Sequence, residues 1–249
     1  MEFSFELLAL LSLVAILAGF IDAIAGGGGL LTIPALLFTG MSPVQAIATN
    51  KLQACFGSFT ATRFFIKQKL VSPKKQVWGI LAAAIGAAIG AMAIQLFDSQ
   101  ILITLLPFAL ILIAVYLVIA KNFGESSDEP KLDEKKFNAS FISGIGFYDG
   151  FFGPGTGTFF TLSYCKMRAM NLIQATAHAK LMNFTTNIVS LMIFILSDQI
   201  IWQIGLAMAV GQIIGARIGA ATAIKQGTNF IRYMTVAVCI AMSISLLLK

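Results

Sequence analysis

Two lysines and two aspartates stand inside strongly apolar stretches of this 249-residue chain. Asp22 precedes a run of glycines and Lys51 follows it, and Asp149 and Lys180 repeat that order in the second half of the chain. A cation near the centre of a bilayer costs about 3 kcal/mol on insertion scales, so it normally faces a cavity or an opposite charge. Two such lysines could hold an anion, and two such aspartates could carry a proton.

The two segments that carry these residues, 19–52 and 146–181, resemble each other along their length. After a two-residue insertion in the second copy, the shared residues are Phe20, Asp22, Gly26, Gly28, Thr32, Met41, Gln45, Ala46, Ala48, Lys51 and Leu52, which recur as Phe147, Asp149, Gly155, Gly157, Thr161, Met170, Gln174, Ala175, Ala177, Lys180 and Leu181. The chain therefore contains a duplicated, glycine-interrupted apolar segment. Many secondary transporters build their site from paired broken helices of this kind.

The glycine runs predict that each helix opens near membrane depth, where exposed backbone is tolerated only against protein or a water-filled cavity. The first run is Gly26, Gly27, Gly28 and Gly29, and the second places Gly153, Gly155 and Gly157 around Pro154 and Thr156. The half-helix after each break would present free N–H groups and a positive dipole end, which suits an anion. A kink or a close helix crossing is the alternative. A dinucleotide-binding loop is disfavoured, since no strand or ribose-binding acid accompanies the glycines.

The four charged residues allow more than one interpretation. Lys51 and Lys180 could clamp a doubly charged oxyanion, or they could snorkel or pair with Asp22 and Asp149. The aspartates could carry a proton, hold the lysines in place, or serve as structural counter-ions. The sequence does not decide between these roles, which are compatible with one another.

Other polar residues in the apolar segments are weaker candidates. Asn50 and Asn183 flank the two lysines and could line a cavity. His178 could line it too or relay protons, although a lone histidine is more often a hydrogen-bonded packing residue. Arg217 could widen the preference for anions or pair with an acid. We expect coupling or counter-ion roles, if any, at Asp22, Asp149, His178 and Arg217.

The amino-acid composition indicates that this chain is embedded in a lipid bilayer rather than dissolved in water. Hydrophobic residues make up 58% of it, charged residues 11%, and the mean hydropathy is +0.88, which predicts a multispanning protein of the lipid bilayer. The net charge of +6 does not indicate nucleic-acid binding, because the cations fall between apolar segments. No nucleophile with a base, metal-ligand cluster or phosphate loop is recognisable, so we expect neither an enzyme nor a cofactor, and no metal.

The predicted fold class is all-α. About 20 helical residues cross the hydrocarbon core, so we expect about eight transmembrane helices and two short broken or re-entrant half-helices, 30–40 and 156–164. The apolar segments are 7–25, 30–40, 44–65, 77–97, 101–120, 137–152, 156–164, 172–196, 200–224 and 230–248.

The chain divides into two repeats, 1–120 and 137–249, joined by a charged linker, 121–136. Five cations between residues 63 and 75 follow the helix of Lys51, which places that end in the cytoplasm. The helix of Lys180 ends without cations, which indicates the outside. We therefore expect an inverted second repeat, both termini outside and a cytoplasmic linker.

Small residues four apart predict close helix packing in both repeats. GAAIGA at 86–91 is matched by GQIIGA at 211–216. Such stripes let helix backbones approach where lipid offers no hydrophobic drive for association. We assign these glycines to packing rather than to the site.

The sequence GFIDAIAGGGGLLTIPAL, followed by ATNKLQ and a diverged second copy, resembles the TauE/SafE family of sulfite exporter-like membrane permeases over nearly the whole chain. The resemblance implies a bacterial inner-membrane protein that moves sulfur-containing anions such as sulfite, sulfoacetate or related organosulfonates, without a cofactor. The motif residues it carries over are Asp22, Gly26 to Gly29, Pro34, Asn50, Lys51, Gly153, Gly155, Gly157 and Lys180. The second copy departs from the pattern at Ser163 and Ala179.

Together these features predict a secondary transporter for a small anion, with a site between inverted halves and coupling to a proton or sodium. A passive anion channel would share the cations and glycines. A membrane scaffold or assembly factor would share the packing glycines but has no use for paired lysines beside paired breaks. Assembly into a homo-oligomer is left open by the sequence.

Overall fold

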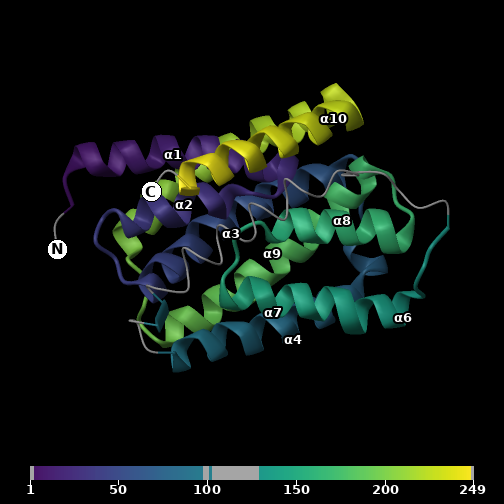
Figure 1. Ribbon diagram of the computed structural model, residues 1–249, viewed down its shortest axis with the longest axis horizontal. Helices are drawn as coiled ribbons and strands as arrows, with labels where there is room; N and C mark the ends of the chain where they lie inside the picture. Colours follow the sequence, from purple (N-terminus) through teal and green to yellow (C-terminus); the bar gives the residue numbers. More distant parts are fainter. Residues whose placement is uncertain (1–2, 98–100, 103–128, 248–249) are drawn as a thin grey trace.

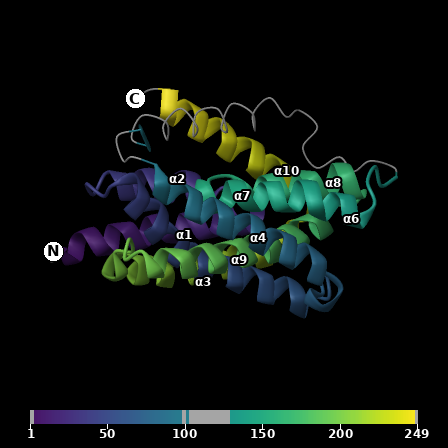
Figure 2. The same ribbon diagram turned by 90° about the horizontal axis from the view of Figure 1, so that it is seen from below.

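The computed structural model describes residues 3–97, 101–102 and 129–247. These residues form helices that lie side by side, roughly along the long axis of the molecule (Figures 1 and 2). Four of the described helices are long and apolar enough to cross a membrane. The all-α, polytopic membrane class is therefore confirmed. Most of the predicted segment 101–120, and half of the linker 121–136, lie outside the described residues.

The first half begins with helices whose ends the sequence explains. Ser4 caps the first helix by accepting a hydrogen bond from the Leu7 N–H, and Ser42 with Gln45 forms a capping box. The elements are α1 (Phe5–Ala25), α2 (Gly28–Leu37), α3 (Pro43–Lys67), η1 (Pro73–Lys75), α4 (Val77–Ala93) and η2 (Ile94–Leu96). The short α2 follows the glycine break as predicted.

The second half repeats this order. Its elements are α6 (Glu134–Phe137), η3 (Asn138–Ile142), α7 (Ser143–Phe151), α8 (Thr156–Arg168), α9 (Leu172–Leu196) and α10 (Trp202–Leu247). The helical run starts at Glu134, inside the predicted linker, because Asp133 caps it. The hydrogen bond from the Lys136 N–H lowers the pKa of the Asp133 carboxyl. Gly227, with φ of 77°, interrupts α10 between the two predicted segments.

Helices α3 and α9, which carry the two lysines, pack against each other at the centre and run antiparallel. The Thr62 hydroxyl donates to the Lys180 carbonyl at 2.8 Å, and the rings of Phe59 and Phe184 lie 5.3 Å apart. Contacts thus move down α3 as they move up α9. The two helices that carry the lysines therefore point in opposite directions.

The outer helices pair across the two halves of the chain. α1 packs on α10, and α4 packs on α7 and α9, so α4 and α10 each pack on helices of the other half of the chain. A side chain at Gly215 would collide with the Ile16 carbonyl, and one at Gly150 with the Ala87 carbonyl. The prediction that the small-residue stripes serve close packing is confirmed. The spatial groups are accordingly α1, α2, α3 and α10 against α4, α7, α8 and α9.

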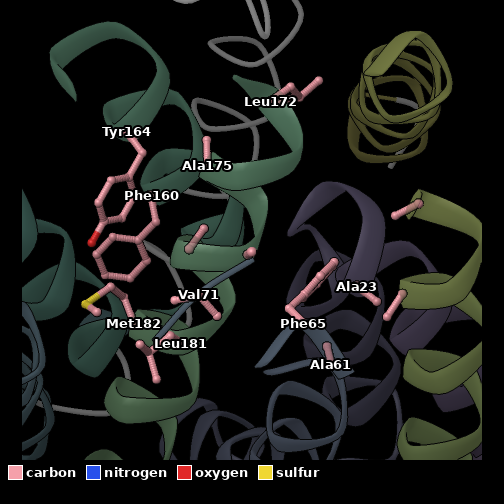
Figure 3. Packing of buried hydrophobic residues seen from close by; sticks show 14 of the residues in the cluster. Ala23, Ala61, Phe65, Val71, Phe160, Tyr164, Leu172, Ala175, Leu181 and Met182 are labelled. Carbon is pink, nitrogen blue, oxygen red and sulfur yellow. The ribbon is translucent and has the colours of Figure 1, made fainter. Parts of the chain in front are cut away.

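A buried apolar cluster joins these groups near the cytoplasmic end predicted for α3 (Figure 3). Phe65 of α3 lies beside Ala23 of α1, and Phe160 lies between Tyr164 of the same helix and Met182 of α9. Burial of large side chains from α8 against α9 fixes the short helix in place. The first turn of α8 is thereby positioned next to the lysines.

Candidate functional site

The two glycine breaks meet at the centre of the molecule. The backbone of Gly26 lies against that of Gly157, and a Cβ on either residue would overlap the other. Gly26 also ends α1 in the left-handed region with φ of 83°, which disfavours any side chain. The Thr158 hydroxyl donates to the Ala25 carbonyl at 2.5 Å and ties α8 to the end of α1. Both breaks thus open into one small region.

Two ion pairs cross between the copies at this point. Lys51 Nζ lies 2.8 Å from Asp149 Oδ1, and Lys180 Nζ lies 2.8 Å from Asp22 Oδ2. Each lysine therefore pairs with the aspartate of the other copy. Both lysine side chains are only 1% exposed, and the formal charges of the four groups cancel.

Asp149 is enclosed by neutral donors in addition to its lysine. The Thr156 hydroxyl donates to Oδ1 at 2.9 Å, the Asn183 amide to Oδ2 at 3.4 Å, and the Thr186 hydroxyl to Oδ2. Its side chain is 1% exposed. Hydrogen bonds to a buried carboxylate compensate for its lost hydration, so these groups stabilise the buried Asp149 side chain.

Asp22 has a more open environment. It receives one backbone hydrogen bond, from the Gly28 N–H at 3.2 Å, besides its contact with Lys180. Its side chain is 20% exposed. The positions that match the three neutral donors of Asp149 hold residues without polar side chains, namely Gly27, Ala54 and Gly57. The two carboxylates therefore differ in their neutral neighbours, while their charged partners are the same.

A small polar cavity lies between the two ion pairs. Its volume of about 20 Å³ is enough for about one water molecule. It is lined by Asp22, Gly26, Gly28, Gly29, Asn50, Lys51, Ala54, Asp149, Gly153, Gly157, Asn183, Asn187 and Gln212. Within the described ranges, no group of three or more histidine, cysteine or acidic side chains is arranged to hold a metal ion.

Ten of the residues singled out from the sequence line this cavity, and Lys180 reaches it through Asp22. Gly27 and Gly155 form the breaks without lining it. His178 lies apart, with Nδ1 2.9 Å from the Gln174 carbonyl and its ring 5.3 Å from that of Tyr164. Arg217 is exposed, and its guanidinium stacks over Phe64 at 5.0 Å. The structure does not bring these last two residues to the cavity.

Several polar residues at the site were missed from the sequence. Thr156 and Thr186 bind Asp149, and Asn187 and Gln212 line the cavity. Hydroxyl and amide residues are common in membrane helices, so threonine and asparagine gave no signal. Gln212 did give one, because it replaces Ala87 between the otherwise matching glycines of the two packing stripes.

The long apolar helices around a buried, charge-lined cavity define a polytopic membrane protein of transporter type. A sequence profile described as "Sulfite exporter TauE/SafE" matches residues 11–246, and the chain belongs to that family of membrane transporters. The resemblance drawn from the duplicated motif is thereby confirmed.

Relatives from several bacteria are similar over almost their whole length. "Probable membrane transporter protein YfcA" of Escherichia coli is 46% identical over 243 residues, which cover 97% of this chain and 90% of the relative. A "Probable membrane transporter protein" of Haemophilus influenzae is 42% identical over 244 residues, 98% of this chain and 95% of the relative. "Probable membrane transporter protein YunE" of Bacillus subtilis is 25% identical over 253 residues, 92% of each chain. No solved structure gives a significant match.

Proposed function

We propose that this protein is a secondary transporter of a small anion, a sulfur oxyanion or an organosulfonate such as sulfite or sulfoacetate. The anion binds near Lys51 and Lys180, and alternating access exposes it to one side of the membrane at a time. The family supports the class of substrate, and the site supports an anion. Transport requires no cofactor in this proposal.

The observation that carries this proposal is the pair of crossed ion pairs at the meeting point of the two helix breaks. A carboxylate and a sulfur oxyanion present similar charged oxygens to an ammonium group. An arriving anion can therefore take the place of a carboxylate beside its lysine. The aspartates act as internal counter-ions that keep the lysines neutralised between transport cycles, which avoids the cost of an unpaired buried charge.

Charge balance supports coupling to a proton. The four charged groups are neutral together and largely buried, so adding a singly charged anion alone would leave an uncompensated buried charge. Protonation of a displaced carboxylate would restore the balance. We assign the proton to Asp22, because its side chain has fewer hydrogen-bond partners than that of Asp149 and is 20% exposed. Entry of sodium with the anion would also balance the charge, and the flux measurement below separates the two ions.

The antiparallel packing of α3 and α9 supports an inverted relationship between the repeats 1–120 and 137–249. We propose that the rocking bodies are the two spatial groups described above, rather than the two halves of the sequence. The cross-packing of α1 with α10 and of α4 with α7 would be disrupted if the sequence halves moved apart. Motion would then take place mainly at the contact between α3 and α9.

The orientation follows from the same proposal. Both termini lie outside, the linker 121–136 is cytoplasmic, and the membrane is the bacterial inner membrane. Fusion of a reporter after Lys249 measures this directly. A cytoplasmic reporter would contradict the inverted arrangement.

The proposed function is tested with purified protein in proteoliposomes. Uptake of sulfite, thiosulfate, sulfoacetate and taurine is measured with imposed proton and sodium gradients. A carrier gives saturable flux, counterflow and dependence on one gradient. Channel-like flux that does not saturate, or no flux of any anion, would reject it in favour of a channel or a scaffold.

A second measurement tests the role of the lysines. Replacement of both Lys51 and Lys180 by Ala should abolish flux in protein that still inserts into liposomes. Unchanged flux would exclude the lysines as anion ligands.

A further inference from the structure

Gln212 is a buried amide that no function described so far uses. It lies on α10, is 3% exposed and lines the cavity. Across the part of the chain that the structure describes, no residue forms a hydrogen bond with its side-chain amide. A buried amide without a hydrogen-bond partner costs free energy, so we look for a partner that binds it during transport.

Two glycines hold this amide in a fixed place. Gln212 Oε1 lies 2.8 Å from the position that a Cβ on Gly19 would occupy, and a Cβ on Gly57 would overlap the same oxygen. Gly19 belongs to α1 and Gly57 to α3, so the amide occupies a slot between two helices. A donor side chain that packing already holds in place loses less conformational entropy when a ligand binds.

The slot belongs to the open side of the cavity. Gly19 stands one turn before Asp22 on α1, and Asp22 and Gln212 both line the cavity. Asp22 is also the carboxylate that lacks neutral side-chain donors. The corresponding position of the first repeat is Ala87, which packs on Gly150 and carries no polar group. The Gln212 amide therefore has no counterpart at the matching position of the first repeat.

We propose that Gln212 is a ligand of the transported anion and that the anion binds on the Asp22–Lys180 side of the cavity. When the anion replaces Asp22 beside Lys180, the Gln212 amide donates a hydrogen bond to one of its oxygens. The Lys51–Asp149 pair stays closed during this step, held by its three neutral donors. This inference rests on the proposed function. It adds to it a neutral ligand and the side of the cavity on which the anion binds.

The test compares sulfite transport by the wild-type protein and by Gln212→Met, which keeps the volume of the side chain and removes its donor. Loss of a hydrogen bond to a charged group predicts a KM about tenfold higher, with Vmax within about twofold. Gln95→Met is the matched control, because the Gln95 amide donates to the Ala91 carbonyl one turn earlier, in α4. The control should keep the wild-type KM.

A second variant moves the amide without removing it. Gly57→Ala pushes the flexible end of Gln212 out of its slot and should raise the KM in the same way. Because both changes affect one contact, the double variant should be no worse than Gln212→Met alone. This variant also tests the inference if Gln212→Met does not fold.

The outcomes separate this inference from the proposed function. Saturable wild-type flux with an unchanged KM in Gln212→Met and Gly57→Ala would overturn the role of Gln212 and leave the transporter proposal standing. Absence of any saturable anion flux in the wild-type protein would overturn both.

Discussion

The two sides of the cavity share a pair of charges and differ in almost everything around them. Asp149 is enclosed by Lys51 and three neutral donors, whereas Asp22 has Lys180, one backbone N–H and a side chain that is 20% exposed. The duplicated framework has kept the lysine, the aspartate and the glycine break in each copy. The difference between the sides arises from uncharged residues, which adjust how tightly each carboxylate is held.

This contrast assigns different tasks to equivalent residues. A carboxylate that accepts several hydrogen bonds is costly to displace, so the Asp149 side is suited to fix the geometry of the site. A carboxylate with few partners exchanges more readily, so the Asp22 side is suited to bind and release. Symmetric charges can therefore support an asymmetric transport step.

The largest expected effect comes from removing one lysine at a time. Lys51→Met leaves Asp149 buried without a cation, which should lower the free energy of unfolding by about 3–5 kcal/mol. Lys180→Met leaves Asp22 partly hydrated and should cost about 1–2 kcal/mol, between the values for buried and exposed pairs. Thermal unfolding in detergent measures both.

The double variant Lys51→Met/Asp149→Asn is the control for this comparison. It removes the unpaired charge together with its partner, so most of the lost stability should return. Equal losses for the two single lysine variants would show that the two sides do not differ in the way described.

A smaller effect is expected from the neutral donors of Asp149. Thr186→Val keeps the shape of the side chain and removes its hydroxyl, which should lower the free energy of unfolding by about 1.5–3 kcal/mol. Thr185→Val is the matched control, because the Thr185 hydroxyl donates only to the Leu181 carbonyl of its own helix. If both variants lower the free energy of unfolding in detergent by the same amount, the hydrogen bond from Thr186 to Asp149 adds no more stability than an ordinary bond within a helix.

The smallest effect is expected at His178, which lies apart from both sides of the cavity. Its hydrogen bond to Gln174 and its contact with Tyr164 indicate a packing role. Proton-driven flux of His178→Gln should stay within about twofold of the wild-type value, whereas Asp22→Asn should lose its dependence on the proton gradient. If flux of the His178→Gln variant no longer depended on the proton gradient, the histidine would take part in transport and the packing role would be wrong.

The charged part of the site could be predicted because charges are rare and costly in a membrane. Lys51, Lys180, Asp22 and Asp149 stood out against apolar neighbours, and their duplication indicated that they meet. The sequence also suggested that lysines and aspartates pair. It did not show that each lysine takes the aspartate of the other copy, because that depends on how the copies face each other.

The neutral part of the site and the exchange of outer helices could not be predicted. Thr156 and Thr186 look like ordinary hydroxyl residues of membrane helices, whose side chains commonly bond to their own backbone. The glycine stripes of α4 and α10 would fit any close-packed partner, so they predicted packing without naming the partner. Gln212 became visible only when the two stripes were compared residue by residue.

The exchange of outer helices has a consequence for how the protein is made. α4 leaves the ribosome long before α7 and α9, yet among the described residues its glycine stripe makes its close backbone contacts with α7. These contacts cannot form until the second half is inserted. Completion of the last helices then closes both exchanged contacts, so assembly of the charged cavity is tied to the end of synthesis.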